Sequence, residues 1–194
     1  AVLGYRYLGI TDHVDASNFD WVLARLRRAA QELNRVSPTK LIPGVEFTHV
    51  PPSQIGQLVQ EARALGAALI VVHGETLVEP VAPGTNRAAL EADIDILAHP
   101  GLLSREDAEL AAQKGIYLEI SARAGHCLAN GHVAALARQV QARLVLNTDA
   151  HSPNNYLTRE RAWLIAQGAG LSPAECEQMF ANAEALAQRA LAKL

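Results

Sequence analysis

The sequence has few of the residues that define several common protein classes. Its 194 residues include only two cysteines, Cys127 and Cys176, whose separation matches neither a disulfide framework nor a paired metal motif. Sparse cysteine of this kind is typical of a reducing compartment, so we expect a cytoplasmic protein. No apolar run approaches the roughly 20 residues of a membrane-spanning helix, and no signal-peptide pattern follows Ala1.

The chain also lacks an excess of charge of either sign. The formal net charge is −3 and no basic block occurs, so nucleic acid is not an expected partner, and neither is a membrane. Hydrophobic residues make up 49% of the chain, which is enough for a sizeable core. We therefore expect one enzyme domain over residues 1–194 with a small-molecule partner, and the oligomeric state stays open.

Apolar runs alternate along the chain with stripes of helical spacing. The runs that predict buried strands are 7–13, 41–46, 69–73, 94–99, 116–120 and 143–148. Helical stripes lie between them; Gly66 ends one, and Ser104 and Gly115 bracket another. Near the end, Ser172-Pro173-Ala174-Glu175 predicts a capping box that opens a terminal pair of Ala-rich helices.

This β/α order predicts an α/β fold with parallel strands. The strands are apolar on both faces, as strands covered by helices should be. A barrel and an open doubly wound sheet both fit this pattern. No Gly-x-Gly-x-x-Gly turn follows a strand, which argues against the dinucleotide-binding version of the open sheet.

Metal-ligand residue types recur where these apolar runs end. The residues are His13, Glu46, His73, His99, Asp149 and His151. In a parallel barrel all strand carboxyl ends open on one face, so this distribution favours a barrel over an open sheet. Histidines with carboxylates suit two or three divalent metal ions, Zn, Mn or Fe. Such ions activate water toward phosphate esters, and no Gly-x-Ser-x-Gly nucleophile motif competes with them.

The motifs around these residues resemble the polymerase-and-histidinol-phosphatase (PHP) family, most closely its stand-alone histidinol-phosphatase-like members. They are Ile10-Thr11-Asp12-His13, Pro43-Gly44-Val45-Glu46, Val72-His73-Gly74-Glu75, Ala98-His99-Pro100-Gly101, Leu118-Glu119-Ile120 and Thr148-Asp149-Ala150-His151. The resemblance implies a distorted (β/α)7 TIM-like barrel whose trinuclear metal centre hydrolyses phosphoesters. In the family, the glutamate that matches Glu46 bridges two metals.

One departure from the family concerns its first strand, which carries an Asp-x-His-x-His motif. No such strand precedes Ala1. We therefore expect the first β-strand, within roughly 20 residues, to be missing from this chain. If the protein itself lacks that strand, its first metal loses two histidine ligands.

The remaining candidate residues have assigned roles. The expected catalytic residues are Glu46, His99 and Asp149, which are also metal ligands. Arg123 and Arg87 are candidates to contact the substrate phosphate, since arginine binds oxyanions in a bidentate manner. For each of them a solvated surface position is the alternative, and for Arg87 it is the favoured one. Asp12 and Glu119 are expected to orient the ligands, and for Glu119 a structural salt bridge is an equal alternative.

The other histidines, His49, His126 and His132, we interpret as surface or loop residues. His126 is the least certain of them, since it lies in the loop after the strand 116–120 on the expected site face. The expected substrate is a small phosphomonoester. Two other classes stay open: a metal-dependent amidohydrolase, and a vestigial module that binds metal without catalysis.

Overall fold

The computed structural model describes residues 1–194 and contains a single parallel sheet. Its strands are β1 (Tyr7–Ile10), β2 (His13–Val14), β3 (Lys40–Phe47), β4 (Leu69–His73), β5 (Ile96–Ala98), β6 (Tyr117–Ser121) and β7 (Leu144–Asn147). The order across the sheet is β1-β3-β4-β5-β6-β7, and β2 pairs with β3. All pairings are parallel, as predicted from the doubly apolar strands.

The sheet curls into a half-barrel and does not close. β1 and β7 are its end strands, and no pairing joins them. The expected TIM-like barrel is therefore seen only as this open, curved sheet with an α/β layout. The first expected strand, 7–13, is split into β1 and β2, because Thr11 and Asp12 between them leave the strand conformation.

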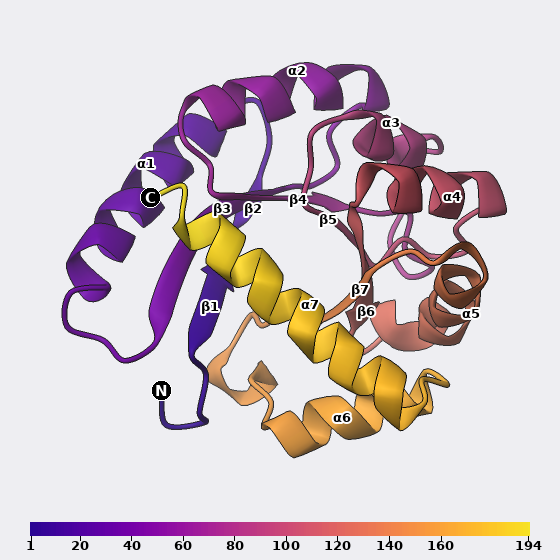
Figure 1. Cartoon of the computed structure of the whole chain (residues 1–194). Helices are drawn as coiled ribbons and strands as arrows, with labels where there is room; N and C mark the ends of the chain where they lie inside the picture. The colour runs from indigo at the N-terminus through magenta and orange to yellow at the C-terminus, as the bar shows by residue number, and fades with distance from the viewer.

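Helices connect the strands and cover both sides of the sheet (Figure 1). They are α1 (Phe19–Leu33), α2 (Pro52–Ala64), α3 (Thr85–Glu91), α4 (Arg105–Lys114), α5 (Asn130–Val140), α6 (Arg159–Gly168) and α7 (Pro173–Leu191), with short 3-10 turns η1 (His126–Ala129) and η2 (Pro153–Asn155). None of these helices has both the length and the apolar character needed to cross a bilayer.

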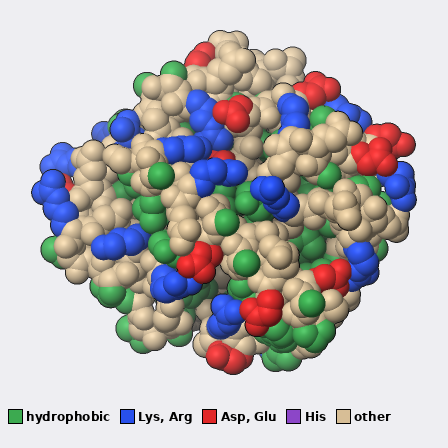
Figure 2. Space-filling model, in the orientation of Figure 1, with side chains coloured by type: hydrophobic (Ala, Val, Ile, Leu, Met, Phe, Trp, Pro, Cys, Tyr) green, Lys and Arg blue, Asp and Glu red, His purple; other side chains and the backbone are tan.

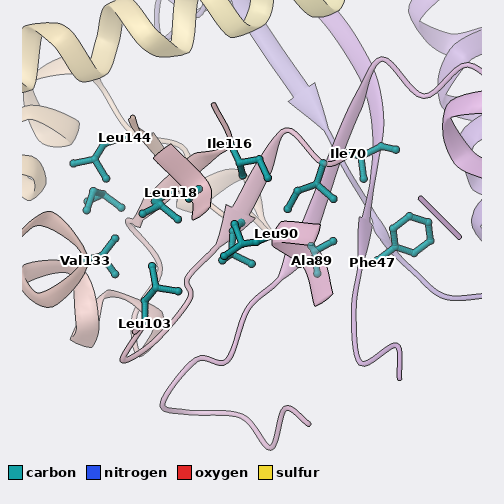
Figure 3. Close-up of a cluster of buried hydrophobic side chains, with 14 of the residues drawn as sticks. Phe47, Ile70, Ala89, Leu90, Leu103, Ile116, Leu118, Val133 and Leu144 are labelled. Atoms are coloured by element: carbon teal, nitrogen blue, oxygen red, sulfur yellow. The ribbon is translucent and has the colours of Figure 1, made fainter. Parts of the chain in front are cut away.

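Strand alternation divides the buried side chains into two cores. On β4, Ile70 and Val72 belong to a core of 32 residues that includes side chains of α1 to α6 and of the start of α7, part of which Figure 3 shows. Their neighbours Leu69 and Val71 belong to a core of 11 residues that includes Leu186 of α7. Glu46, His73 and Glu119 point to the same side of the sheet as the second core. Alternate residues of a strand face the same side, and each of the three lies an even number of residues from a member of that core on its own strand.

The helix boundaries follow local signals in the sequence. The Ser104 side chain caps α4 by accepting from Asp107 N, and Gly115 ends this helix with a left-handed φ of 69°. Ser172 and Glu175 form the predicted capping box at the start of α7. The prediction of two helices after Ser172 is wrong. α7 is continuous for 19 residues, since its Ala-rich sequence contains no glycine or proline after Pro173 to stop it.

α7 lies across the sheet and contacts β7, β1 and β3, so it connects the two open ends of the half-barrel. The face that carries α7 shows scattered charged and apolar side chains and no histidine (Figure 2). The histidines therefore gather elsewhere, at the carboxyl ends of the strands.

Candidate metal centre

The six predicted ligands gather where the strands end, at the carboxyl-terminal edge of the half-barrel, which we call the mouth. His13 stands beside Glu46 in the pairing of β2 with β3, and His73 stands beside Ala98, which precedes His99. Contacts between aromatic rings link every histidine except His132 into one group, with centroids 4.1 to 6.2 Å apart. The gathering is thus seen in the structure, while metal binding by these residues stays a prediction.

Within this group, His73, His99 and His126 form a buried trio. One ligand atom from each lies within 4.8 Å of the others, and all three side chains are buried. The rings of His99 and His126 stack at 4.1 Å. Burial lowers the pKa of His73 to about 4, so this imidazole is neutral at pH 7, the form that binds metals.

The interpretation of His126 as a surface residue is wrong. The turn η1 folds the residue inward, so that only 5% of it is exposed. Its Nδ1 lies 2.7 Å from the buried Thr76 Oγ1, and its Nε2 lies 3.7 Å from Asp149 Oδ2. Its place directly after β6, on the face where the other ligands gather, was the signal that could have identified it.

The second set, the exposed trio, consists of His13, Asp149 and His151. Their ligand atoms also lie within 4.8 Å of one another, but His13 and His151 are exposed. His13 Nε2 is 3.1 Å from His151 Nε2. These residues come from β2 and from the segment after β7, near the two open ends of the sheet, which explains their exposure.

Two buried atoms, one in the buried trio and one beside it, have no hydrogen-bond partner. They are Glu46 Oε1 and His99 Nε2, which lie 3.9 Å apart. Burial raises the pKa of Glu46 to about 8. A buried carboxylate is stable only beside a cation or hydrogen-bond donors. The buried Asp95, at the other end of the sheet, has such partners: it accepts hydrogen bonds from Arg63, Arg189 and Ile70 N. Glu46 has no such partners, so the donors around it fit a divalent cation.

Glu119 orients His99. Its Oε1 accepts from His99 Nδ1 at 3.2 Å and its Oε2 from Asn147 Nδ2 at 3.0 Å. Burial alone would raise the pKa of Glu119, but the hydrogen bond and charge of His99 outweigh burial and hold this pKa below its ordinary value. Burial lowers the pKa of His99, but Glu119, Glu46 and Asp149 together hold this pKa above its ordinary value. When the ring is neutral, Nδ1 donates to Glu119 and the Nε2 lone pair faces Glu46.

Asp12 does not have the expected orienting role. It is exposed, and the Nδ1 atom of the neighbouring His13 lies 2.6 Å from Thr48 Oγ1 instead. The Thr48 hydroxyl in turn donates to Glu46 O at 3.3 Å, so it accepts from His13. The pairing of β2 with β3 brings Thr48 to His13, and a partner fixed by strand pairing cannot be found from the sequence neighbour Asp12, which is the physical reason for the error.

The two candidate arginines occupy different places. Arg123 lies at the exposed trio, where its Nη1 donates to Asp149 O at 3.1 Å and to His151 Nδ1 at 2.6 Å. Its side chain is 33% exposed and can face a ligand at the mouth. Arg87 instead forms an ion pair with Asp107 of α4 at 2.8 Å. This contact fits the alternative of a solvated surface arginine and does not support a contact with substrate.

Backbone strain concentrates at the mouth. His49, His99 and Asp149 have positive φ angles of 54°, 29° and 45°, and Gln141 is the only other non-glycine residue with one. Conformations of this kind cluster at functional sites. Asp149 therefore leaves the extended conformation of β7, although it and His151 reach the same cluster.

Two glycines let the loops after β4 and β5 approach each other. A Cβ on Gly74 would lie 2.4 Å from Ala98 O, and one on Gly101 would lie 1.9 Å from Glu75 O. Asn86 joins the same loops, accepting from Glu75 N and donating to Pro100 O. The glycines of the His73-Gly74 and His99-Pro100-Gly101 motifs thus allow the close packing that holds His73 and His99 side by side.

Sequence reasoning missed a carboxylate in this region. Glu79, in the loop between β4 and α3, lies 3.1 Å from His73 Nε2. It is also 3.5 Å from the Nε2 atoms of both His126 and His49, and His49 is otherwise a half-exposed loop residue, as expected. No sequence pattern singles out Glu79, because it belongs to an irregular stretch rich in proline and glycine.

Comparison with known proteins supports the fold. No family model matches the chain. A crystal structure described as an amidohydrolase superposes with a TM-score of 0.52 at 17% identity, over 79% of this chain and 43% of that one. A crystal structure of an uncharacterized protein gives 0.57 at 11% identity, over 97% of this chain and 65% of that one. This chain thus spans less than two thirds of each.

A relative in sequence is closer. The uncharacterized protein MJ1295 of Methanocaldococcus jannaschii is 42% identical over 178 residues, which cover 91% of this chain and 82% of that protein. Identity at this level over this length places the two chains in one family. The chain belongs to the family of MJ1295.

Proposed function

We propose that this protein is a metal-dependent hydrolase of small phosphomonoesters, related to the PHP phosphoesterases. The observation that carries the proposal is the pair of buried, unpartnered atoms Glu46 Oε1 and His99 Nε2 among a group of histidines. A divalent cation would give both atoms a partner. Histidine nitrogens with carboxylate oxygens are the donors that Zn, Mn and Fe accept.

The residues at the mouth would hold two ions. His73, His99 and His126 with Glu46 form one donor set, and His13, Asp149 and His151 form the other. Ions bound there would supply activated water and positive charge for in-line displacement at phosphorus. The protein contributes the positions of the donors: Glu119 holds His99, Gly74 O accepts from His73 Nδ1 at 3.0 Å, and Thr48 holds His13.

Arg123 supports a phosphate substrate over a neutral one. Its guanidinium lies against Asp149 and His151 and is partly exposed, so it can donate to the non-bridging oxygens of a monoester. A neutral amide would have no comparable use for a fixed cation beside the ions. This arrangement favours phosphoester hydrolysis over the amide hydrolysis that the same fold could also support.

The test uses protein purified without any chelator. We expect two or three divalent ions per chain by elemental analysis, and hydrolysis of p-nitrophenyl phosphate that chelation abolishes and Mn or Zn restores. A dihydropyrimidine serves as the amide substrate in parallel. Less than one ion per chain would contradict the proposal. Turnover of only the dihydropyrimidine would assign the site to amide chemistry, and full metal loading with no turnover of either would indicate a non-catalytic module.

A further inference from the structure

The loop between β4 and α3 places a carboxylate against the buried trio. Glu79 reaches over His73 and His126, with one oxygen 3.1 Å from His73 Nε2 and the other 3.5 Å from His126 Nε2. The two histidine side chains are 2% and 4% exposed, while that of Glu79 is 38% exposed. Glu79 therefore approaches the trio from its solvent side.

The position of Glu79 is fixed by the loop that carries it. At the start of this loop, Glu75 accepts through Oε1 from Gly84 N and Asn86 N, at 3.0 and 2.9 Å. These two hydrogen bonds close the loop on itself at the first turn of α3. Glu79 lies between the closed ends, so its place at the mouth follows from an anchored loop.

The contact between Glu79 and His73 pairs two acceptors when the ring is neutral. A neutral ring carries one proton, whereas Gly74 O and the Glu79 carboxylate can both only accept, so the proton cannot serve both contacts. With the proton on Nδ1 toward Gly74 O at 3.0 Å, the Nε2 lone pair faces a carboxylate oxygen at 3.1 Å. Two acceptors at that distance repel each other unless a cation lies between them.

The spacing also suits a shared ion. Two ligands about 2.1 Å from a tetrahedral zinc ion lie about 3.4 Å from each other. The contacts of Glu79 with His73 and His126, at 3.1 and 3.5 Å, match this separation. We propose that Glu79 is a metal ligand, brought by the loop, which adds a carboxylate donor to His73, His99 and His126. This inference rests on the proposed metal centre.

The test measures zinc affinity by competition with a chelating dye, in wild type and in Glu79→Gln. The amide keeps the shape of the side chain and removes its charge, so we expect binding weaker by about 10-fold or more. Glu91→Gln removes the same charge from an exposed position at the end of α3 and should bind as wild type does. Glu79→Asp, which keeps the carboxylate, should recover part of the affinity.

A second measurement reports on the ligands directly. In protein loaded with Co²⁺, the visible ligand-field bands should change in Glu79→Gln and stay unchanged in Glu91→Gln. Wild-type affinity together with wild-type bands in Glu79→Gln would overturn the assignment of Glu79 and leave the metal centre standing. Wild-type protein that binds less than one ion per chain would overturn both proposals.

Discussion

The two histidine trios differ in how far the protein prepares them for a metal. In the buried trio, Glu119 and Gly74 O can accept hydrogen bonds from the Nδ1 atoms of His99 and His73, and a neutral ring then presents a bare Nε2. In the exposed trio, His151 Nδ1 contacts both the Arg123 donor at 2.6 Å and the Asp149 carbonyl at 3.0 Å, and when the ring accepts from Arg123 the proton of a neutral ring is on Nε2. That proton points to His13 Nε2, 3.1 Å away. The buried trio is ready for an ion, whereas the exposed trio must rearrange first.

Position in the sheet explains this difference. The buried trio comes from β4, the end of β5 and the turn after β6, which have neighbours on both sides. The exposed trio comes from β2 and the segment after β7, where the half-barrel is open. Strands in the middle of a sheet can surround a ligand with supporting groups, and end strands cannot. We therefore expect a tight ion at the buried trio and a weaker one at the exposed trio.

The largest effect should come from Glu46, whose carboxylate lies beside the buried trio. Glu46→Gln should lower kcat by about 10²-fold or more, because it removes the charge that offsets an ion there. Steady-state kinetics on metal-loaded protein would measure this. Unchanged turnover would remove Glu46 from the mechanism.

The same variant should change stability in opposite directions with and without metal. In metal-free protein the pKa of Glu46 is raised from its ordinary 4.5 to about 8. The protonated form of Glu46 therefore stabilises the metal-free fold fully below pH 4.5, and this stabilisation is lost as pH rises through about 8. Above pH 8, Glu46→Gln should have a higher Tm than wild type in chelator and a lower Tm with metal. Equal melting curves in chelator at all pH values would contradict the buried charge.

Substitution of one ligand in each trio tests the comparison itself. His99→Asn should weaken the tighter ion by about 10-fold or more, while His13→Asn should affect only the weaker one. Zinc titration resolves the two affinities, and circular dichroism checks that each variant folds. Equal losses from both variants would show that the trios hold one shared set of ions, and the distinction between them would then be wrong.

Much of this site could be predicted from the sequence. The ends of 41–46 and 69–73 identified Glu46 and His73 because buried parallel strands have continuous apolar runs, and their carboxyl ends share one face. Ser104, Gly115 and Ser172 identified helix ends for similarly local reasons. Such features depend on a few consecutive residues, so the sequence states them directly.

What the sequence did not predict depends on loops and on distant partners. His126 reaches the site through a 3-10 turn and Glu79 through an irregular loop, and neither conformation has a periodic pattern. The replacement of Asp12 by Thr48 as the partner of His13 depends on the pairing of β2 with β3.

Arg123 should connect the exposed trio to the substrate. Arg123→Ala should raise KM for a phosphomonoester about 10-fold, the effect of one lost charge-assisted hydrogen bond. Because the arginine no longer donates to His151 Nδ1, the ring can place its proton there and bind an ion through Nε2, so metal content should not fall. KM and metal content are measured on the same preparation. A lower kcat at unchanged KM would instead show that Arg123 only positions the ligands.

The smallest effect should come from a site remote from both trios, the capping box of α7. Arg138 and then Ser172 hydrogen-bond to Glu175 and lower its pKa to about 2. The stabilisation is therefore complete above the ordinary value of 4.5 and is lost as pH falls toward about 2. Glu175→Ala should reduce the free energy of unfolding by about 1 kcal/mol at pH 7, mostly through loss of the capping-box hydrogen bond from Ser172 N, since an exposed ion pair contributes little. Urea unfolding at pH 7 and at low pH measures the difference, which should shrink as the pH falls.

Both zinc affinities should stay at wild-type values in this variant, because α7 lies across the sheet from the mouth. A selective loss at one trio would show that α7 supports that trio directly.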